Sequence, residues 1–207
     1  MYTSLLKLGQ EHVSLAVNVL SDSFMDNPML IYLFPWINIR KKVLPIAFKA
    51  VVMRVVNKGE IYATSDKMEG ILWIERKGHA TPDLVKALIK ATKHTYPQLL
   101  PFLLKRVAKI KKIGIAINKY YHKPHNFVRI SIIAVGKEHR GKKLMSKMIG
   151  AVFNEVENTN IYCLVETETE SNVQIYQHLG FRLVEIIEEV TGKLYFYILV
   201  YDPHFLV

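Results

Sequence analysis

The residues best suited to chemistry lie in the second half of this sequence. An apolar run at 127–135 ends in a charged loop with Arg140, Gly141, Lys142 and Lys143, and a helical pattern follows at once. The first amides of a helix have no intrahelical acceptor, and the helix dipole adds partial positive charge there. With three cations beside them, these amides predict a binding site for an anion such as a phosphate group.

Four other side chains could take part in a reaction. Glu166 and Glu168 stand at the C-terminal end of a predicted strand, 161–165, where each could act as a general base, bind a cation or simply be a solvated acid. By spacing alone, Tyr176 is a packing residue of a short helix. We expect Cys163 to be a core residue, because no histidine is placed to activate its thiol.

The sequence offers little for metal binding or disulfide formation. His122 and His125 form an HxxH pair, but no matching pair of ligands stands elsewhere, so we expect no metal site. A single cysteine excludes an internal disulfide and favours a reducing, cytoplasmic location. No apolar segment has the length of a transmembrane helix, and the N-terminal apolar run is too short for a signal peptide.

The charge is unevenly distributed along the 207 residues, whose formal net charge is +10. The segment 76–123 contains twelve Lys/Arg and one acid, whereas 155–190 contains eight Glu and one Arg. This separation of charge predicts that the basic segment attracts an anion (a phosphorylated ligand, anionic lipid or nucleic acid) and that the acidic segment attracts a cation.

Hydrophobic periodicity and turn residues predict an α/β fold with a mixed central sheet. The expected elements are a strand at 3–8, helices at 11–24 and 39–57, a hairpin of 60–65 and 69–75, helices at 81–92 and 98–113, a strand at 127–135, a helix at 141–157, a strand at 161–165, a helix at 171–179 and a hairpin of 181–188 and 193–200. Thr81 and Pro82 fit the N-cap and N1 positions of the helix expected at 81–92.

Two segments leave alternatives open. The aromatic stretch 29–36 is either a loop or short helical turn beside a binding site, or a hydrophobic connector. The amphipathic helix 98–113 presents either an ordinary solvated face, a cationic lid over an anionic ligand, or a membrane-binding surface. Specific nucleic-acid binding is the weaker interpretation, because no recognition motif accompanies the charge.

The strand 127–135 is apolar on both faces, as expected at the centre of a sheet. Regular alternation predicts one face of Val128, Ile130, Ile132 and Ala134, and an opposite face of Phe127, Arg129, Ser131, Ile133 and Val135.

Taken together, these features resemble the GNAT superfamily of acetyl-CoA-dependent N-acetyltransferases. The strand is followed at the family's distance by Arg140-Gly141-Lys142 and a helix, and the next strand ends in Val165-Glu166-Thr167. The stretch from Asn172 through Tyr176 to Gly180-Phe181 matches the family's N-x-x-x-Y-x-x-x-G-F pattern. The resemblance covers 126–200 well and the N-terminal half by element order only.

The resemblance implies a role for each matching position. Main-chain groups of Ile133 and Val135 would pair with the pantetheine arm of acetyl-CoA as an extra strand, amides from Arg140 to Ser146 would hold its pyrophosphate, and Asn172 would contact the arm. The implied cofactor-binding residues are Ile133, Ala134, Val135, Arg140, Gly141, Lys142, Lys143, Leu144, Met145, Ser146 and Asn172. Tyr176 would be the general acid, and the general base stays open between Glu166 and Glu168.

The sequence departs from the family pattern at two loop positions. Lys143 and Met145 stand where the family has small residues, usually glycine, which let the backbone approach the pyrophosphate. We expect a helical Lys143 that keeps its amide available and adds a positive charge.

The resemblance therefore implies one acetyltransferase-like domain, 1–207, with a basic helical insertion at 76–123 and an acetyl-CoA-binding core at 126–200. We expect acetyl transfer from acetyl-CoA, as cosubstrate, to the primary amine of a small cationic molecule, because the region 155–190 is acidic. Transfer to a protein or peptide amine and non-catalytic acyl-CoA binding are the alternatives. No metal, specific nucleic-acid partner or transmembrane segment is expected, and a homodimer is left open.

Overall fold

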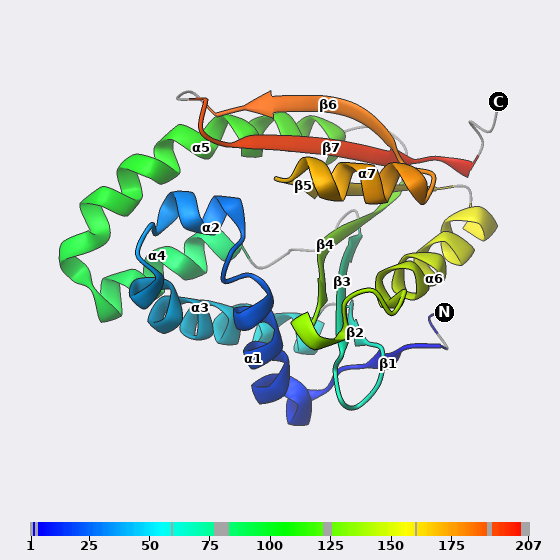
Figure 1. Cartoon of the computed structure of the whole chain (residues 1–207), viewed down its shortest axis with the longest axis horizontal. Helices are drawn as coiled ribbons and strands as arrows, with labels where there is room; N and C mark the ends of the chain where they lie inside the picture. The colour runs from blue at the N-terminus through cyan, green and yellow to red at the C-terminus, as the bar shows by residue number, and fades with distance from the viewer. Residues whose placement is uncertain are drawn as a thin grey trace.

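The computed structural model describes residues 2, 4–58, 60–76, 83–121, 126–159, 161–189 and 192–203, and the side chains within these ranges except those of 58, 112, 113 and 116–121. A mixed sheet with helices on both faces forms its centre (Figure 1). In the described ranges it has seven strands, in the order β1-β2-β3-β4-β5-β7-β6: β1 Leu6–Lys7, β2 Glu60–Ala63, β3 Gly70–Arg76, β4 Phe127–Val135, β5 Tyr162–Thr167, β6 Arg182–Glu188 and β7 Tyr195–Tyr201. Only the β4–β5 pair of these strands is parallel.

The helices divide between the two faces of this sheet. The α-helices are α1 Val13–Ser23, α2 Pro28–Leu33, α3 Ile37–Lys58, α4 Leu84–Thr95, α5 Leu100–Tyr121, α6 Leu144–Thr159 and α7 Glu170–His178, with short 3₁₀ turns at Gln10–His12, Pro97–Leu99 and Lys137–His139. In Figure 1, α2 to α5 gather at the left and α6 lies at the right. The predicted fold class is confirmed.

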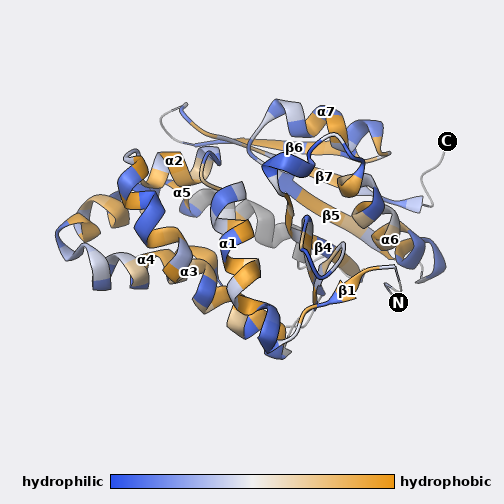
Figure 2. Cartoon of the chain, turned by 60° about the horizontal axis from the view of Figure 1, so that its bottom comes forward, coloured by the Kyte–Doolittle hydropathy of each residue, from blue (hydrophilic) through white to orange (hydrophobic). Residues whose placement is uncertain are grey.

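Two hydrophobic cores hold the helices to the sheet. The first joins α1 to α5 to one face through residues such as Leu44, Phe48 and Trp73, and the second joins α6 and α7 to the other through residues such as Met148 and Val173. Hydrophobic residues dominate the strands β4 and β5 between them (Figure 2). Cys163 is fully buried in the second core, where burial raises the pKa of its thiol, as expected of a packing residue.

A β-bulge changes the expected alternation along β4. The pairing with β3 shifts where Trp73 opposes Ile132 and Ile74 opposes Ile130, so Ser131 is the extra residue. Before the bulge, Ile130 faces the second core, whereas beyond it Ile132 faces the first. The prediction of one continuous face was therefore wrong from Ser131 onward, because an inserted residue reverses the sides on which later side chains emerge.

Several element boundaries also differ from the prediction. The first strand is only Leu6–Lys7, and 28–33 forms the short helix α2. Asp83 is the N-cap of α4, its carboxylate accepting from the Lys86 amide at 3.0 Å, whereas Thr81 and Pro82 lie outside the described residues. The helix expected from Gly141 begins at Leu144.

The segment that leads from α1 to α3 is held by a buried arginine. Arg40 donates to the carbonyl oxygens of Met25 (2.9 Å), Phe34 (2.7 Å) and Pro35 (2.9 Å). Buried carbonyl groups need hydrogen-bond partners, so one side chain fixes both ends of the turn that carries α2. This places Asn27, the N-cap of α2, in a defined position beside the end of β5.

Candidate active site

The parallel strands β4 and β5 separate halfway along their length. Their pairing runs from Phe127 opposite Tyr162 to Ile130 opposite Val165 and then stops, although β4 continues to Val135 and β5 to Thr167 (Figure 1). From Ser131 onward, β4 therefore has no described strand partner on this side. A strand edge of this kind presents amide and carbonyl groups to which an extended ligand can bind.

One hydrogen bond at the end of β4 shows which main-chain amide and carbonyl groups of this strand point toward the opening between β4 and β5. The Gly136 amide donates to the Glu69 carbonyl at 2.8 Å, on the β3 side. Because successive amides of a strand point to opposite edges, the Ala134 amide also faces β3, whereas those of Ile133 and Val135 face the opening. The structure thus directs toward the opening the main-chain groups of two predicted residues, Ile133 and Val135, and directs those of Ala134 away.

The charged loop after β4 leads the chain into the N-terminus of α6. Gly141 and Lys143 adopt left-handed conformations, with φ of +79° and +57°. The Lys143 carbonyl accepts from the Lys147 amide at 3.0 Å, so the helix starts directly after it. The amides of Leu144, Met145 and Ser146 occupy the first turn, where they have no intrahelical acceptor.

This geometry corrects the expectation of a helical Lys143. Its left-handed conformation is the one that glycine adopts without strain, which explains why a small residue suits this position. Its side chain is exposed, as are those of Arg140 and Lys142, so all three cations are available to an anion. Met145 is half-buried and packs against the second core.

Of the two candidate bases, Glu166 is held in a buried ionic network. Arg129 donates from Nε to both Glu166 oxygens at 2.9 and 2.8 Å and from one terminal nitrogen to Glu75 at 2.8 Å. The side chains of Glu166 and Glu75 are only 9% and 4% exposed. Burial raises the pKa of Glu166 and the Arg129 charge opposes this effect, so Glu166 is committed to an existing partner.

Glu168 lies in the turn after β5 and contacts the N-terminus of α2. Asn27 Nδ2 donates to Glu168 Oε2 at 3.0 Å, while Asn27 Oδ1 accepts from the Leu30 amide at 3.1 Å and caps the helix. Burial raises the pKa of Glu168 to about 7, with the Asn27 hydrogen bond acting in the opposite direction. A carboxylate with such a pKa is half ionised near neutral pH and can exchange a proton there.

Tyr176 is on α7, with its ring in the second core and only 3% exposed. The ring packs edge-on against Phe181, with centroids 5.4 Å apart. Burial raises the pKa of the Tyr176 phenol, and the negative charges of Glu168 and Glu166 raise it further. The phenol is therefore protonated at neutral pH and can serve only as a proton donor. The first residue of the N-x-x-x-Y pattern, Asn172, donates to Thr167 Oγ1 at 3.0 Å and so fixes α7 to the end of β5.

Sequence reasoning missed three polar residues of this region. Glu75 and Arg129 are charged residues inside otherwise apolar strands, a pattern that could have indicated a buried ion pair. Asn27 precedes Pro28, and this N-cap pattern could have been recognised, but its bond to Glu168 spans 141 positions. His122 and His125 lie outside the described residues, and no group of three or more His, Cys, Asp or Glu suited to a metal occurs within them.

Comparison with known proteins agrees with this arrangement. Residues 77–181, about half of the chain, match the model of the acetyltransferase (GNAT) family. The chain belongs to this family. A search of curated proteins gave no match.

Solved structures share the GNAT fold at low sequence identity. A Corynebacterium glutamicum structure described as histone acetyltransferase HPA2 and related acetyltransferase is 18% identical, with a TM-score of 0.63 over 97% of each chain. A mosquito arylalkylamine N-acetyltransferase like 5b is 13% identical (TM-score 0.57; 96% of this chain, 98% of that one). The Escherichia coli ribosomal-protein-S18-alanine N-acetyltransferase is 11% identical (TM-score 0.52; 96% and 92%). Of the helices described here, none is long and apolar enough to cross a bilayer.

The left-handed conformation of Lys143 generates a prediction about stability. Lys143→Gly should increase the free energy of unfolding by about 0.5–1 kcal/mol, because relief of backbone strain exceeds the entropy that glycine adds to the unfolded chain. Lys142→Gly is the matched control: this exposed neighbour has no left-handed conformation to relieve, so the same change should reduce stability. Urea unfolding compares the two, and equal effects at both positions would contradict the interpretation.

Proposed function

We propose that this protein transfers the acetyl group of acetyl-CoA to the primary amine of a small cationic acceptor. One observation carries the proposal: β4 and β5 separate before β5 ends, and β5 is followed at once by Glu168, a carboxylate whose pKa is about 7. Membership of the acetyltransferase family supports acetyl-CoA as the donor.

The residues around the opening fit acetyl-CoA in three places. The outward-facing main-chain groups of Ile133 and Val135 would pair with the amide groups of the pantetheine arm. The first-turn amides Leu144–Ser146, with Arg140, Lys142 and Lys143, would hold the pyrophosphate, because helix N-termini and cations both favour anions. The thioester, when bound, supplies an acetyl carbonyl activated toward attack by an amine.

Glu168 is the best-placed proton acceptor in the described part of the chain. An amine arrives as an ammonium ion and must lose a proton before its nitrogen can attack the acetyl carbon. The carboxylate can take this proton directly or through water, whereas Glu166 is already bound by Arg129. The excess of Glu75, Glu166 and Glu168 over Arg129 favours a cationic acceptor.

Tyr176 is the proposed proton donor to the leaving sulfur. As the carbon–sulfur bond breaks, the CoA thiolate takes the phenolic proton, and the phenolate recovers a proton released by the acylated nitrogen through solvent. Burial raises the pKa of Tyr176. Poor solvation at the same place also raises the pKa of the CoA thiol. The proton affinities of the thiolate and of the Tyr176 phenolate therefore stay comparable.

Contacts between distant elements favour a small acceptor over a protein substrate. The Tyr32 hydroxyl on α2 donates to the buried Glu189, directly after β6, at 2.8 Å. Arg106 on α5 donates to the Tyr32 carbonyl and stacks over its ring, 4.9 Å from the centroid. These bonds join α2, α5 and the β6–β7 hairpin, and a long peptide lying between them would have to break buried polar interactions.

The proposal is tested by CoA release from acetyl-CoA with a panel of free amines, acidic and neutral analogues, and peptides with free N-termini. We expect turnover with small cationic amines. Turnover with peptides alone would favour the protein acetyltransferase alternative, and acetyl-CoA binding without turnover on any amine would contradict the enzymatic assignment.

The pH dependence of kcat/KM should report Glu168. The carboxylate accepts a proton only when ionised, so the rate should rise with pH and level off above an inflection near pH 7. Asn27→Ser keeps a capping oxygen for α2 but removes the donor to Glu168, so the carboxylate loses stabilisation of its charge and the inflection should move to higher pH. Asp66→Asn, in the exposed β2–β3 turn, is the control. Glu168 would be excluded as the proton acceptor if the inflection in kcat/KM did not move in Asn27→Ser and was still present in Glu168→Gln.

Tyr176→Phe should reduce kcat about 100-fold or more and leave the KM for acetyl-CoA nearly unchanged, because it removes the proton but keeps the ring. The contact with Phe181 is preserved, so thermal unfolding should stay within a few degrees of the parent protein. Phe181→Leu, which alters the same contact without removing a proton, separates packing from proton transfer. An unchanged kcat in Tyr176→Phe would remove the proposed role.

A further inference from the structure

The helices to the left in Figure 1 have an unusual composition. Residues 28–58 contain six Lys/Arg and 84–121 contain nine, and neither segment contains a single Asp or Glu. These two segments carry α2 to α5, which pack against one another. Their positive charge exceeds the net charge of the whole chain, +10, so the remainder of the protein is net negative.

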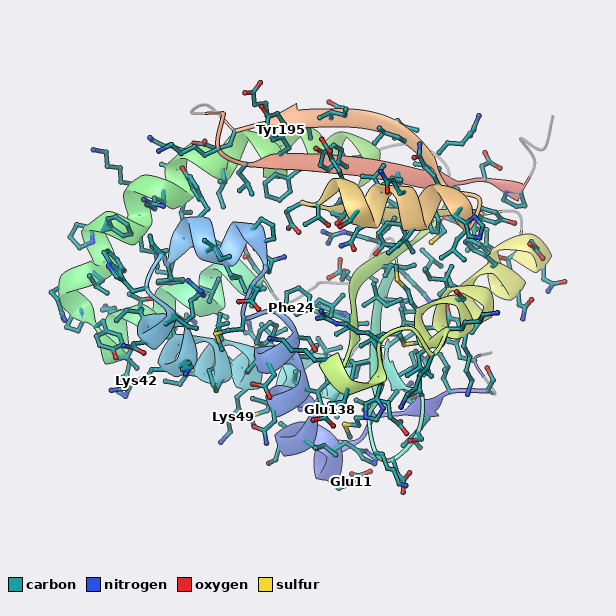
Figure 3. All side chains as sticks on the ribbon, viewed as in Figure 1. Glu11, Phe24, Lys42, Lys49, Glu138 and Tyr195 are labelled. Carbon is teal, nitrogen blue, oxygen red and sulfur yellow. The ribbon has the colours of Figure 1, made fainter. Side chains whose placement is uncertain are left out.

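One outward stripe of α3 alternates cations with apolar side chains. Lys42, Ile46, Lys49 and Met53 are spaced four, three and four residues apart, which places them on one face of the helix, and all four are exposed. Ile46 and Met53 are 42% and 43% exposed. Figure 3 shows Lys42 and Lys49 at the outer edge of the molecule. The opposite face of α3, with Leu44 and Phe48, is fully buried in the first core, so the stripe is not required for folding.

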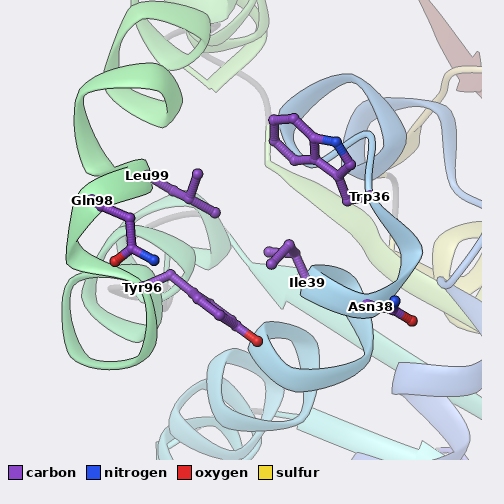
Figure 4. Close-up of a pocket in the computed structure, with 6 residues that line it drawn as sticks. All are labelled: Trp36, Asn38, Ile39, Tyr96, Gln98 and Leu99. Carbon is purple, nitrogen blue, oxygen red and sulfur yellow. The ribbon is translucent and has the colours of Figure 1, made fainter.

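The stripe leads to a hollow between the start of α3 and the turn from α4 to α5. This hollow, of about 340 Å³, is lined by Trp36, Asn38, Ile39, Tyr96, Gln98 and Leu99 (Figure 4). Lys42 lies over the Tyr96 ring, with Nζ 5.9 Å from the centroid. Trp36 is 48% exposed and packs against Phe102, and the guanidinium carbon of Arg106 lies 4.4 Å from the centroid of the Phe102 ring.

Exposed apolar residues concentrate in the same segments. Of the twelve large hydrophobic side chains exposed in the described ranges, seven lie in 28–58 and 84–121, a third of the chain. Apolar residues gathered on a surface generally mark an interaction site, and the charged residues of these two segments are all Lys or Arg.

We propose that this surface, formed by the α3 stripe, the hollow at Trp36 and the adjoining part of α5, binds an anionic lipid bilayer. Lysine and arginine near a membrane attract acidic headgroups, and their long stems let apolar neighbours enter the interface. An exposed tryptophan beside a hollow suits the interfacial region, where this residue is favoured. A nucleic acid would pair with the cations but would leave Ile46 and Met53 without a favourable environment.

The two tryptophans allow a direct test, because Trp36 is half exposed and Trp73 is only 4% exposed. The intact protein is mixed with phosphatidylcholine vesicles, with or without phosphatidylglycerol, and binding is measured by co-sedimentation and tryptophan emission. We expect binding to the phosphatidylglycerol vesicles only, weakened by salt, with a blue shift of the emission that disappears in Trp36→Phe.

Charge reversal separates this surface from general electrostatic attraction. Lys42→Glu with Lys49→Glu should reduce vesicle binding by at least about tenfold, because each basic residue near an anionic membrane contributes favourably. Lys7→Glu with Lys67→Glu makes the same change in net charge at exposed residues outside the surface and should have a much smaller effect. Thermal unfolding of both pairs confirms folding.

Three results would overturn the proposal: no binding to anionic vesicles, equal loss in the two double variants, or salt-dependent retention on DNA that matches vesicle binding without a change in Trp36 emission. None of these measurements depends on acetyl transfer, so the surface and the proposed function are tested separately.

Discussion

The early end of pairing between β4 and β5 is the constraint on which the rest of the site depends. Strands that stay paired to their ends leave no free edge, whereas these separate after Ile130 and Val165. The bulge at Ser131 lies at the point of separation and bends β4, as bulges do. It also determines which main-chain and side-chain groups of 132–135 face each side, and the charged loop after β4 leads into the N-terminus of α6.

The second feature is the placement of charge at the end of β5. Arg129 engages the carboxylates of both Glu75 and Glu166 inside the sheet, which satisfies buried groups that would otherwise be costly to desolvate. Glu168 is two residues farther along, and its side-chain partner in the described part of the chain is the neutral amide of Asn27. This difference in partners gives two nearby glutamates different chemistry: one is a structural ion-pair member, and the other has a pKa near neutrality.

The order and type of the elements could be predicted from periodicity, and the loop from Arg140 to Ser146, proposed to bind the pyrophosphate, could be singled out by its pattern. The remaining features could not, because they depend on contacts between distant residues. An inserted residue in β4 is defined only by its pairing with β3, so the alternation beyond Ser131 was reversed. The bond from Asn27 to Glu168 and the ion pairs of Arg129 likewise require the tertiary structure. The left-handed Lys143 was missed because lysine seldom adopts this conformation.

The central claim is that acetyl-CoA binds as an extra strand along the free edge of β4. Amide hydrogen exchange measured by NMR, with and without acetyl-CoA, tests it residue by residue. The account predicts that exchange slows at the amides facing the opening, Ile133 and Val135, while Ala134, whose amide faces β3, changes little and is an internal control. The account would be contradicted if the Ile133 and Val135 amides exchanged as fast with saturating acetyl-CoA as without it.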